Sequence, residues 1–282
     1  MANPLVPKPS AVRYCELMVP TPPLAPRISA IALWLLALAS SLPAQGPGYM
    51  VVRCVKTLPG HGAGYRYMIL ETVAEAMRAQ VEKGQMYSWG FARSVIPAGE
   101  EARCDFLLFD VYEGFPPQPI DPYFEKAGGL MATDGWQTRA ASQSKLVSVE
   151  LWQDLDKTGS VETGSYLRVN QIKTGEFDNW ARMQSEIWKP VHEARIRDGD
   201  FQGWLASRVI MPSGADWPNP ARTISVFADW KSLNRPARYR ELMPAVHPGK
   251  NPEEILTGIA NLQEILRTEV FEVIELIRRP AR

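Results

Sequence analysis

The stretch EIWKPVHEARIRDG contains the one histidine of this chain that lies within a recognisable motif. His192 follows Trp188 by one helical turn and stands next to Glu193, so it could serve as a general acid or base, or as a haem ligand. A purely structural role is also open, in which His192 bonds a loop carbonyl and anchors the kink expected at Pro190.

A second set of candidates combines arginine and tryptophan with carboxylate and amide side chains. Arginine binds carboxylates and phosphates with its planar fork, and tryptophan supplies an apolar wall. Grouped around one cavity, such residues would bind a small anionic or aromatic molecule. The alternative is a filled core, in which arginine and glutamate satisfy one another. The candidates are Arg53, Trp89, Arg93, Glu150, Arg168, Asn170, Trp204, Arg208 and Glu275.

Other chemistries find little support in the sequence. No three ligands stand at metal spacing, no glycine-rich phosphate loop follows a strand, and no serine or cysteine nucleophile motif is present. Lys plus Arg equals Asp plus Glu at 31 each, so no bulk charge recruits nucleic acid. We therefore expect no metal and no nucleic-acid partner, and the oligomeric state is left open.

The elements that must position these residues occur twice. Landmarks recur in the same order at a spacing of about 115 residues, which indicates a duplicated domain. We place repeat 1 at 48–155, a linker at 156–163 and repeat 2 at 164–282. The matched landmarks are Tyr49, Val52, Lys56, Glu71, Gly84, Trp89, Arg93, Pro97 and Gly99 with Tyr166, Val169, Lys173, Glu186, Gly199, Trp204, Arg208, Pro212 and Gly214.

Alternating and helical spacings predict the same order of elements in each half. Repeat 1 is expected to have strands at 49–56, 86–96, 104–112 and 146–152, with helices at 65–83 and within 121–141. Repeat 2 is expected to have strands at 166–173, 201–211, 222–230 and 269–277, with helices at 177–197 and from Asn251. Each half is thus βαββαβ, the ferredoxin-like plan. The bare faces of the two sheets can pack together, which predicts an α+β protein with an eight-stranded antiparallel barrel and helices outside.

This plan resembles the dimeric α+β barrel superfamily, with both halves fused in one chain. The stretch EIWKPVHEARIRDG, with the following GW and the VIMPSG turn, is similar to exported bacterial proteins of this kind. The resemblance covers the chain from about residue 48. The superfamily includes cofactor-free monooxygenases, haem-degrading enzymes, haem peroxidases and lactone isomerases. It therefore implies the fold and leaves the activity open. Some haem-binding relatives use a helix histidine, which makes haem on His192 the one cofactor to consider.

Strand alternation predicts which side chains face the barrel interior. We expect Phe201, Leu205 and Val209 to face the helices, which directs Trp204, Ala206, Arg208 and Ile210 inward. By the repeat, Trp89, Phe91, Arg93 and Val95 also face inward. In the first strands, Met50, Val52, Cys54, Leu167 and Val169 suit the helix side, which sends Arg53, Arg168 and Asn170 inward. Glu150 and Glu275 are expected at matching places of the fourth strands.

The N-terminal sequence predicts that the protein is exported. Arg27 precedes the apolar run ISAIALWLLALASSL, which is short of the roughly 20 residues of a membrane span and typical of a signal peptide. Residues 1–44 are assigned to leader and signal, with cleavage after Ala44 and translation starting at Met1 or Met18. We expect an exported protein, periplasmic or secreted, with no membrane span after cleavage; an uncleaved anchor is the alternative.

Cleavage leaves one pair of cysteines, Cys54 and Cys104, in an oxidising compartment. The first and third strands of a ferredoxin-like sheet are antiparallel neighbours, so the two cysteines should lie side by side. Both share parity with residues expected to face the helices. We expect a disulfide, with two buried thiols as the alternative.

Three functions follow. The leading hypothesis is an exported barrel protein that binds a small anionic or aromatic molecule in the barrel interior. The second is a haem-binding or monooxygenase- or isomerase-type enzyme centred on His192. The third is a structural or interaction protein with a filled barrel core. Whether the protein is an enzyme stays open.

Overall fold

The computed structural model describes residues 48–116, 134–213 and 221–279; the expected leader and signal lie outside these residues. The first half contains β1 (Tyr49–Thr57), α2 (Gly62–Met68), η1 (Ile69–Val73), α3 (Ala74–Glu82), β2 (Ser88–Ile96), η2 (Gly99–Glu101), β3 (Phe106–Tyr112), α5 (Asp134–Gln143) and β4 (Ser144–Gly159). The second half contains β5 (Tyr166–Lys173), α6 (Phe177–Met183), η4 (Gln184–Trp188), α7 (Lys189–Arg197), β6 (Gly203–Met211), β7 (Ala221–Phe227), η5 (Lys231–Asn234), α8 (Tyr239–Val246), α9 (Pro252–Leu262) and β8 (Glu264–Arg278).

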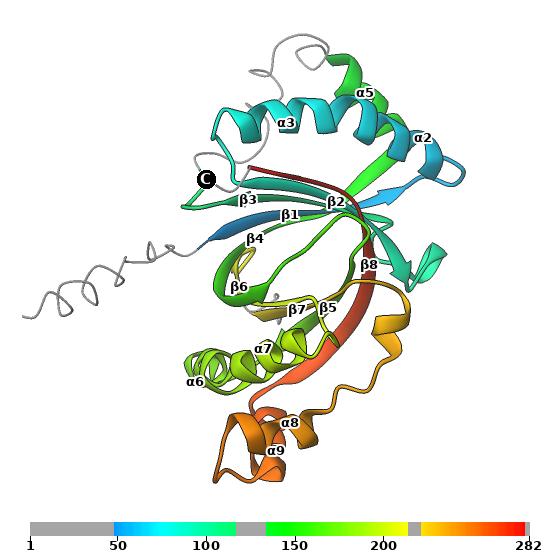
Figure 1. Cartoon of the computed structure of the whole chain (residues 1–282). Helices are drawn as coiled ribbons and strands as arrows, with labels where there is room; N and C mark the ends of the chain where they lie inside the picture. The colour runs from blue at the N-terminus through cyan, green and yellow to red at the C-terminus, as the bar shows by residue number, and fades with distance from the viewer. Residues whose placement is uncertain (1–47, 117–133, 214–220, 280–282) are drawn as a thin grey trace, which may run out of the picture. The chain divides into compact units, whose positions relative to one another are not determined.

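All eight strands join into one closed barrel in the order β1-β3-β2-β8-β5-β7-β6-β4. Each half contributes a four-stranded ferredoxin-like sheet, and the two sheets close on each other through β2 with β8 and β4 with β6. Every pairing is antiparallel. In Figure 1 helices α2 and α3 cover the sheet of the first half, and α6 and α7 cover that of the second. The expected fold class is confirmed.

The two long strands make this closure. β4 pairs with β1 through Ser144–Gln153 and with β6 through Leu151–Gly159, so its two ends belong to different sheets. It therefore continues four residues into the segment expected as a linker. β8 does the same between β5 and β2, and a register shift opposite Phe91 and Ala92 reverses the facing of its C-terminal part.

The long helix of each half contains one π-helical turn at the matching place, η1 in repeat 1 and η4 in repeat 2. Pro190 was expected to kink or restart its helix, and α7 indeed begins at Lys189 with Pro190 in its first turn. Because repeat 1 has the same turn and no proline there, the interruption belongs to the repeated plan. The expected cap of α9 is confirmed, since Asn251 Oδ1 accepts from the Glu253 amide at 3.0 Å.

The apolar side chains form three cores, one inside the barrel and two between the sheets and the helices. The interior core consists of buried residues from the strands of both halves and their connections. The first helix-side core packs α2, η1 and α3 against the outer face of the repeat 1 sheet. The second helix-side core packs α6, α7, α8 and α9 against the outer face of the repeat 2 sheet. The interior face and the helix-covered face of the sheets are therefore both apolar.

The predicted facing directions are wrong by one residue. Trp89 and Phe91 lie in the first helix-side core, and Trp204 and Ala206 lie in the second. The residues expected to face the helices lie in the interior core instead: Met50, Val52, Cys54, Leu167, Val169, Leu205 and Val209. Phe201 alone faces the helices as expected. Alternation could not separate the faces, because interior and helix-covered faces both select apolar side chains.

Cys54 and Cys104 form the expected disulfide, with a Cα–Cα distance of 5.3 Å. Its face differs from the expectation. Both cysteines lie in the interior core together with Leu107, whereas Phe106 and Leu108 pack in the first helix-side core. The bond ties β1 to the segment that precedes β3. Among the described residues, the helices are all too short or too polar to cross a membrane.

Candidate functional site

The second helix-side core encloses a charged side chain. Arg195, on α7, is 2% exposed. Its Cζ lies 4.4 Å from the centroid of the Phe201 ring and 5.3 Å from that of Tyr239. Arg195 Nη1 donates to the Tyr239 hydroxyl at 3.2 Å, and Nε has no partner among the described residues. A guanidinium is thus held between two aromatic rings under α8.

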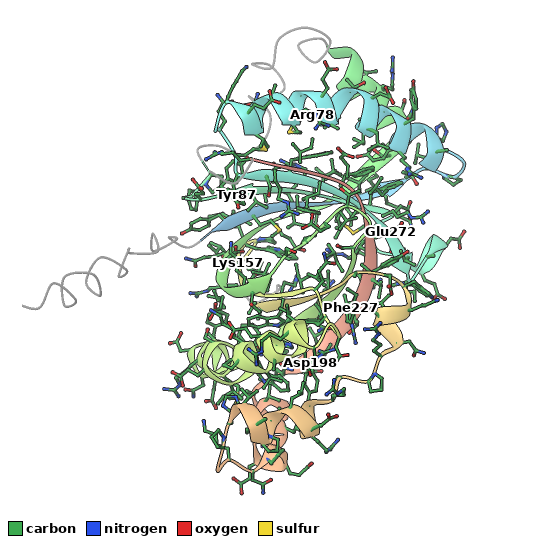
Figure 2. All side chains as sticks on the ribbon, viewed as in Figure 1. Arg78, Tyr87, Lys157, Asp198, Phe227 and Glu272 are labelled. Atoms are coloured by element: carbon green, nitrogen blue, oxygen red, sulfur yellow. A yellow bond between two sulfur atoms is a disulfide. The ribbon has the colours of Figure 1, made fainter. Side chains whose placement is uncertain are left out.

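Arg168, on β5, is its neighbour. Arg168 Cζ lies 4.7 Å from the centroid of Phe227, and the rings of Phe227 and Phe201 meet edge to face at 5.4 Å. In Figure 2 Phe227 lies between the barrel strands and α7. Burial lowers the pKa of Arg168, and the charge of Arg195 lowers it further. The buried Nε of Arg168 also lacks a described partner. The two positive charges therefore act on each other.

Within the part of the chain that the structure describes, no carboxylate comes within ion-pair distance of Arg168 or Arg195. The two carboxylates that follow α7 are engaged elsewhere, because Arg238 Nη1 lies 3.4 Å from Asp198 and 2.9 Å from Asp200. Buried charges are normally paired. Among the described residues, Arg168 and Arg195 therefore have no carboxylate as counter-charge.

Repeat 1 also holds an arginine on its helix-covered face, at a different position of the repeat, and this arginine is paired with a carboxylate. Arg53 donates to both carboxylate oxygens of Asp110, at 3.0 and 2.6 Å, with side-chain exposures of 13% and 5%. Trp89 pairs with Asp110 in repeat 1, and Trp204 pairs with Ser225 in repeat 2. A serine thus occupies the place of the neutralising aspartate. Arg53 itself has Asn170 at its place in repeat 2, and Arg168 has Val51 at its place in repeat 1. The two halves therefore place their arginines at different positions of the repeated sheet.

His192 lies beside this pair and is 4% exposed. Its ring centroid is 5.9, 5.1 and 5.0 Å from those of Trp188, Phe201 and Trp204. Burial, and then the charge of Arg195, lower the pKa of His192 to about 3. The imidazole is therefore neutral near pH 7 and a weak base. Its Nδ1 has no described partner.

The carbonyl-anchoring role considered for His192 belongs to another histidine. His247 Nε2 lies 2.9 Å from the carbonyl oxygen of Ile187, inside η4. Neutral imidazole and two guanidinium groups are chemically suited to haem iron and propionates. The packing does not fit, because three aromatic rings enclose His192 and leave no face for a porphyrin.

The barrel interior contains a cluster of buried apolar side chains. Of the predicted site residues, Glu150 faces it, at 1% exposure. Glu150 accepts hydrogen bonds from Arg103 Nη2 at 3.1 Å, Arg222 Nη2 at 3.0 Å and Trp152 Nε1 at 2.8 Å. Three charged or polar donors satisfy this carboxylate. The cluster stabilises the interior and offers no unmet bonding capacity at Glu150.

The remaining predicted residues are dispersed. Arg93 pairs with Glu272 at 2.5 Å near the surface, and Glu275 pairs with Arg78 of α3 at 3.3 Å. The Glu275 position therefore differs from that of Glu150, owing to the register shift in β8. Asn170 donates to Thr223 Oγ1 at 3.0 Å, and exposed Arg208 lies over Phe177 at 4.8 Å. Among the predicted site residues that the structure describes, Trp204 and His192 are in ring contact, and Arg168 lies over Phe227 of the same helix-side core.

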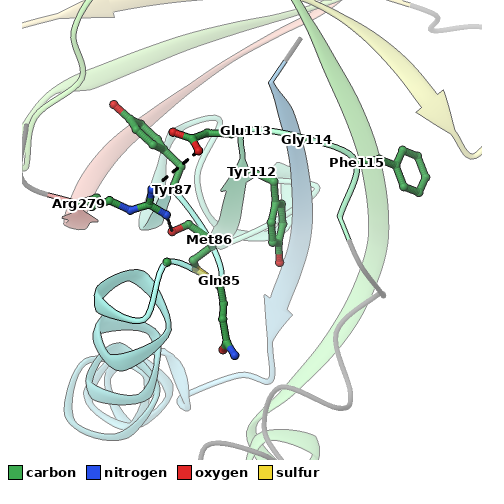
Figure 3. Close-up of a pocket in the computed structure, with 9 residues that line it drawn as sticks. Gln85, Met86, Tyr87, Tyr112, Glu113, Gly114, Phe115 and Arg279 are labelled. Atoms are coloured by element: carbon green, nitrogen blue, oxygen red, sulfur yellow. Dashed lines mark hydrogen bonds and ion pairs between the residues drawn. The ribbon is translucent and has the colours of Figure 1, made fainter. Parts of the chain in front are cut away.

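A surface pocket of about 180 Å³ lies in repeat 1, where the segment before β2 meets the residues that follow β3 and β8 (Figure 3). Tyr87, Phe115, Glu113 and Arg279 are among its lining residues. Arg279 there has partners, since Nη1 lies 3.8 Å from Glu113 and Nη2 donates to the Met86 carbonyl oxygen at 3.3 Å. Because its cation is paired, this pocket is a weaker candidate than the repeat 2 face.

Sequence reasoning missed Arg195, Tyr239 and Phe227. A signal for Arg195 existed, because it follows His192 within the same motif and falls on the apolar side of the helix. Tyr239 has no counterpart in the matched landmarks and no periodicity that could have linked it to β5. Its place depends on how α8 folds back onto α7.

No protein-family model matches the chain, and neither does any curated protein. Among solved structures, a candidate monooxygenase from Lactobacillus acidophilus has a TM-score of 0.50 at 10% identity, covering 83% of this chain and 96% of that one. Another candidate monooxygenase, from Fusobacterium nucleatum, has a TM-score of 0.54 at 12% identity, covering 83% and 95%. Likeness at this identity shows the fold alone, an α+β barrel.

Proposed function

We propose that this protein binds a small anionic molecule with an aromatic or flat apolar frame. The site is the helix-covered face of repeat 2, around Arg168 and Arg195. This keeps the ligand class expected from the sequence and moves its place from the barrel interior to the outer face of the sheet. Binding is proposed here, and a reaction is not.

One observation carries the proposal. Arg195 is buried and Arg168 is partly buried, yet the described residues supply neither with a carboxylate, whereas repeat 1 pairs its own Arg53 with Asp110. Desolvating a cation without a counter-charge is costly, so a protein that retains two of them gains most when an anion completes the site. The partly exposed ring of Tyr239, beside Arg195, offers an aromatic surface for the ligand frame.

The test is titration with a simple aromatic anion, benzoate, followed by intrinsic tryptophan fluorescence and calorimetry. Trp188 and Trp204 both contact His192 and should report occupancy. Arg168→Gln should weaken binding by about 10-fold or more, because a hydrogen bond to a charged group contributes about 1.5–3 kcal/mol.

The matched control is Arg208→Gln. Arg208 also lies over a phenylalanine ring and has no ion pair among the described residues, but it is exposed. The Arg208→Gln variant should bind benzoate with the same affinity as the unmodified protein. Equal losses in both variants would reduce the effect to general surface charge, and absence of saturable binding by any aromatic anion would refute the proposal.

A haem-binding function centred on His192 is the second candidate, favoured by a neutral imidazole with an unpartnered Nδ1. Because the aromatic enclosure of His192 opposes it, we expect added haemin to give no Soret band. A band that appears with haemin and disappears in His192→Ala would reverse this preference.

We also propose that the protein is exported after cleavage behind Ala44. The disulfide between Cys54 and Cys104 supports this, because such bonds persist in oxidising compartments. Fractionation of bacterial cells expressing the full chain, with the N-terminus of the product sequenced, tests it. A mature chain beginning at Gln45 outside the cytoplasm is expected, and an intact cytoplasmic chain would contradict it.

A further inference from the structure

The surface pocket of repeat 1 holds two opposite charges side by side. Arg279 follows β8 and Glu113 follows β3, and both line the cavity of about 180 Å³. Arg279 Nη1 lies 3.8 Å from Glu113 Oε2, which is longer than a hydrogen bond. Among the described residues, the guanidinium donates one hydrogen bond, from Nη2 to the Met86 carbonyl oxygen at 3.3 Å. Both charged groups are partly exposed and keep hydrogen-bonding capacity that a bound molecule can use.

Backbone hydrogen bonds between three segments fix the shape of this pocket. The Tyr87 amide donates to the Val111 carbonyl oxygen at 2.8 Å, and the Arg279 amide donates to the Tyr87 carbonyl oxygen at 3.2 Å. The segment before β2 is thus bonded both to β3 and to the end of β8. Figure 3 shows Tyr87 on the same side of the pocket as the pair of Arg279 and Glu113. Because backbone bonds hold these walls, the pocket is formed before a ligand arrives, which lowers the cost of binding.

Repeat 2 forms the same corner of its sheet without the two charges. The strand registers place Ser160 where repeat 1 has Arg279. They place Ala228 where repeat 1 has Glu113. The backbone bond is nevertheless retained, since the Ser160 amide donates to the Gln202 carbonyl oxygen at 3.1 Å. The fold therefore does not require a charged pair at this corner, and a role in binding can account for it.

The size and the lining of the pocket restrict its ligand. Sites for drug-sized ligands have roughly 300–1,000 Å³, so a cavity of about 180 Å³ accepts a smaller molecule. Tyr87 and Phe115 are 38% and 61% exposed and supply aromatic surface for an apolar group. A simple anion would be repelled by Glu113, and a simple cation by Arg279. A molecule that carries both charges on neighbouring atoms can meet an opposite charge at each residue.

We propose that this pocket binds a free α-amino acid with an apolar side chain. The carboxylate of the amino acid accepts from Arg279, its ammonium group donates to Glu113, and its side chain lies against the ring of Tyr87. The pocket is separate from the site proposed around Arg168, so either proposal can fail while the other stands.

The experiment compares leucine with two compounds that have the same branched side chain and lack one charge each, 4-methylpentanoate and 3-methylbutylamine. All three are aliphatic, so the site proposed for aromatic anions in repeat 2 does not contribute. Binding is measured by calorimetry near pH 7, where leucine carries both charges. Leucine should bind about 10-fold or more tightly than either of the other compounds, a difference of about 1.4 kcal/mol.

Two variants assign each charge of leucine to its partner. Arg279→Gln should reduce the preference for leucine over 3-methylbutylamine to about 2-fold or less, and Glu113→Gln should do the same for the preference over 4-methylpentanoate. The control is Arg78→Gln, because Arg78 is 53% exposed and pairs with Glu275 outside the pocket, and it should retain both preferences. Absence of saturable leucine binding, preferences unchanged in both pocket variants, or an equal loss in Arg78→Gln would overturn the inference.

Discussion

At Arg53 and at Arg168 the two halves of this protein treat a guanidinium group in opposite ways. Arg53 meets Asp110 in a bidentate pair, and Arg168 meets only an aromatic ring and a second arginine. In repeat 2 the place of Asp110 is taken by Ser225 and the place of Arg53 by Asn170, so the ion pair of repeat 1 has no equivalent there.

The buried pair in repeat 1 should be sensitive to losing one partner. Arg53→Met leaves Asp110 buried without its cation and should lower the free energy of unfolding by about 3–5 kcal/mol. Urea unfolding measures this. Adding Asp110→Leu to the same chain should recover most of the loss, because the unpaired charge is gone. A single variant as stable as the parent would show that the pair is not desolvated.

The lowered pKa of His192 predicts how the free energy of unfolding depends on pH. Its pKa is lowered to about 3 in the folded protein, against about 6.5 in the unfolded chain. Below pH 6.5 the unfolded state therefore binds the additional proton, so this contribution is fully present above pH 6.5 and is lost as pH falls toward 3.

Between these limits the free energy of unfolding should fall by at most about 1.4 kcal/mol per pH unit. His192→Leu should flatten that slope, and the exposed His61→Gln should not. Urea unfolding at a series of pH values measures the three slopes. Equal slopes in the parent and in His192→Leu would mean that His192 titrates normally.

At the scale of the element, the strands are constrained on both faces. Gly90 of β2 faces the interior core, where a Cβ would meet the Phe109 ring at 2.0 Å. A side chain there cannot be accommodated by a rotamer change alone, because Phe109 is itself packed in the core. The glycine lets β2 lie against an aromatic side chain of its neighbour β3.

Gly90→Ala should therefore lower the free energy of unfolding by about 1–3 kcal/mol, the usual cost of overpacking a core. Gly62→Ala, at the start of α2, is the control. Its added Cβ meets nothing nearer than Thr57 Oγ1 at 3.7 Å, so its effect should be neutral or stabilising by up to about 1 kcal/mol. Thermal and urea unfolding of both variants decide, and a harmless Gly90→Ala would contradict the packing described for β2 and β3.

At the scale of the whole molecule, strand pairing in the barrel joins distant parts of the chain. The disulfide between Cys54 and Cys104 adds a covalent link between two of them. The disulfide links residues separated by 50 positions and ties β1 to the segment that carries Arg103 toward Glu150. Closing a loop of this length should contribute about 4 kcal/mol through the unfolded state.

Replacing both Cys54 and Cys104 by serine should lower the free energy of unfolding by about that amount. Reductant should destabilise the parent during urea unfolding and leave the double variant unchanged. A double variant as stable as the oxidised parent would show that the bond does not form or does not constrain the unfolded chain.

The sequence by itself determined the duplication, the order of the strands, the main helices other than α8, the closed barrel, the cap at Asn251 and the nearness of Cys54 to Cys104. These features depend on local spacing, turn chemistry and a repeated plan, all of which are written along one stretch of chain at a time. The antiparallel neighbourhood of β1 and β3 followed from that plan, so it could be predicted with the rest.

Only the tertiary structure decided which face of each strand looks inward and which residues share a site. Interior and helix-covered faces are both apolar, so alternation along β2, β5 and β6 fits either assignment, and the shift within β8 is invisible in the sequence. The approach of Arg168, Arg195 and Tyr239 joins β5, α7 and α8, which no local pattern connects. Which charged groups of the described chain lie beside an arginine is set by packing in three dimensions, so their pairing could not be predicted either.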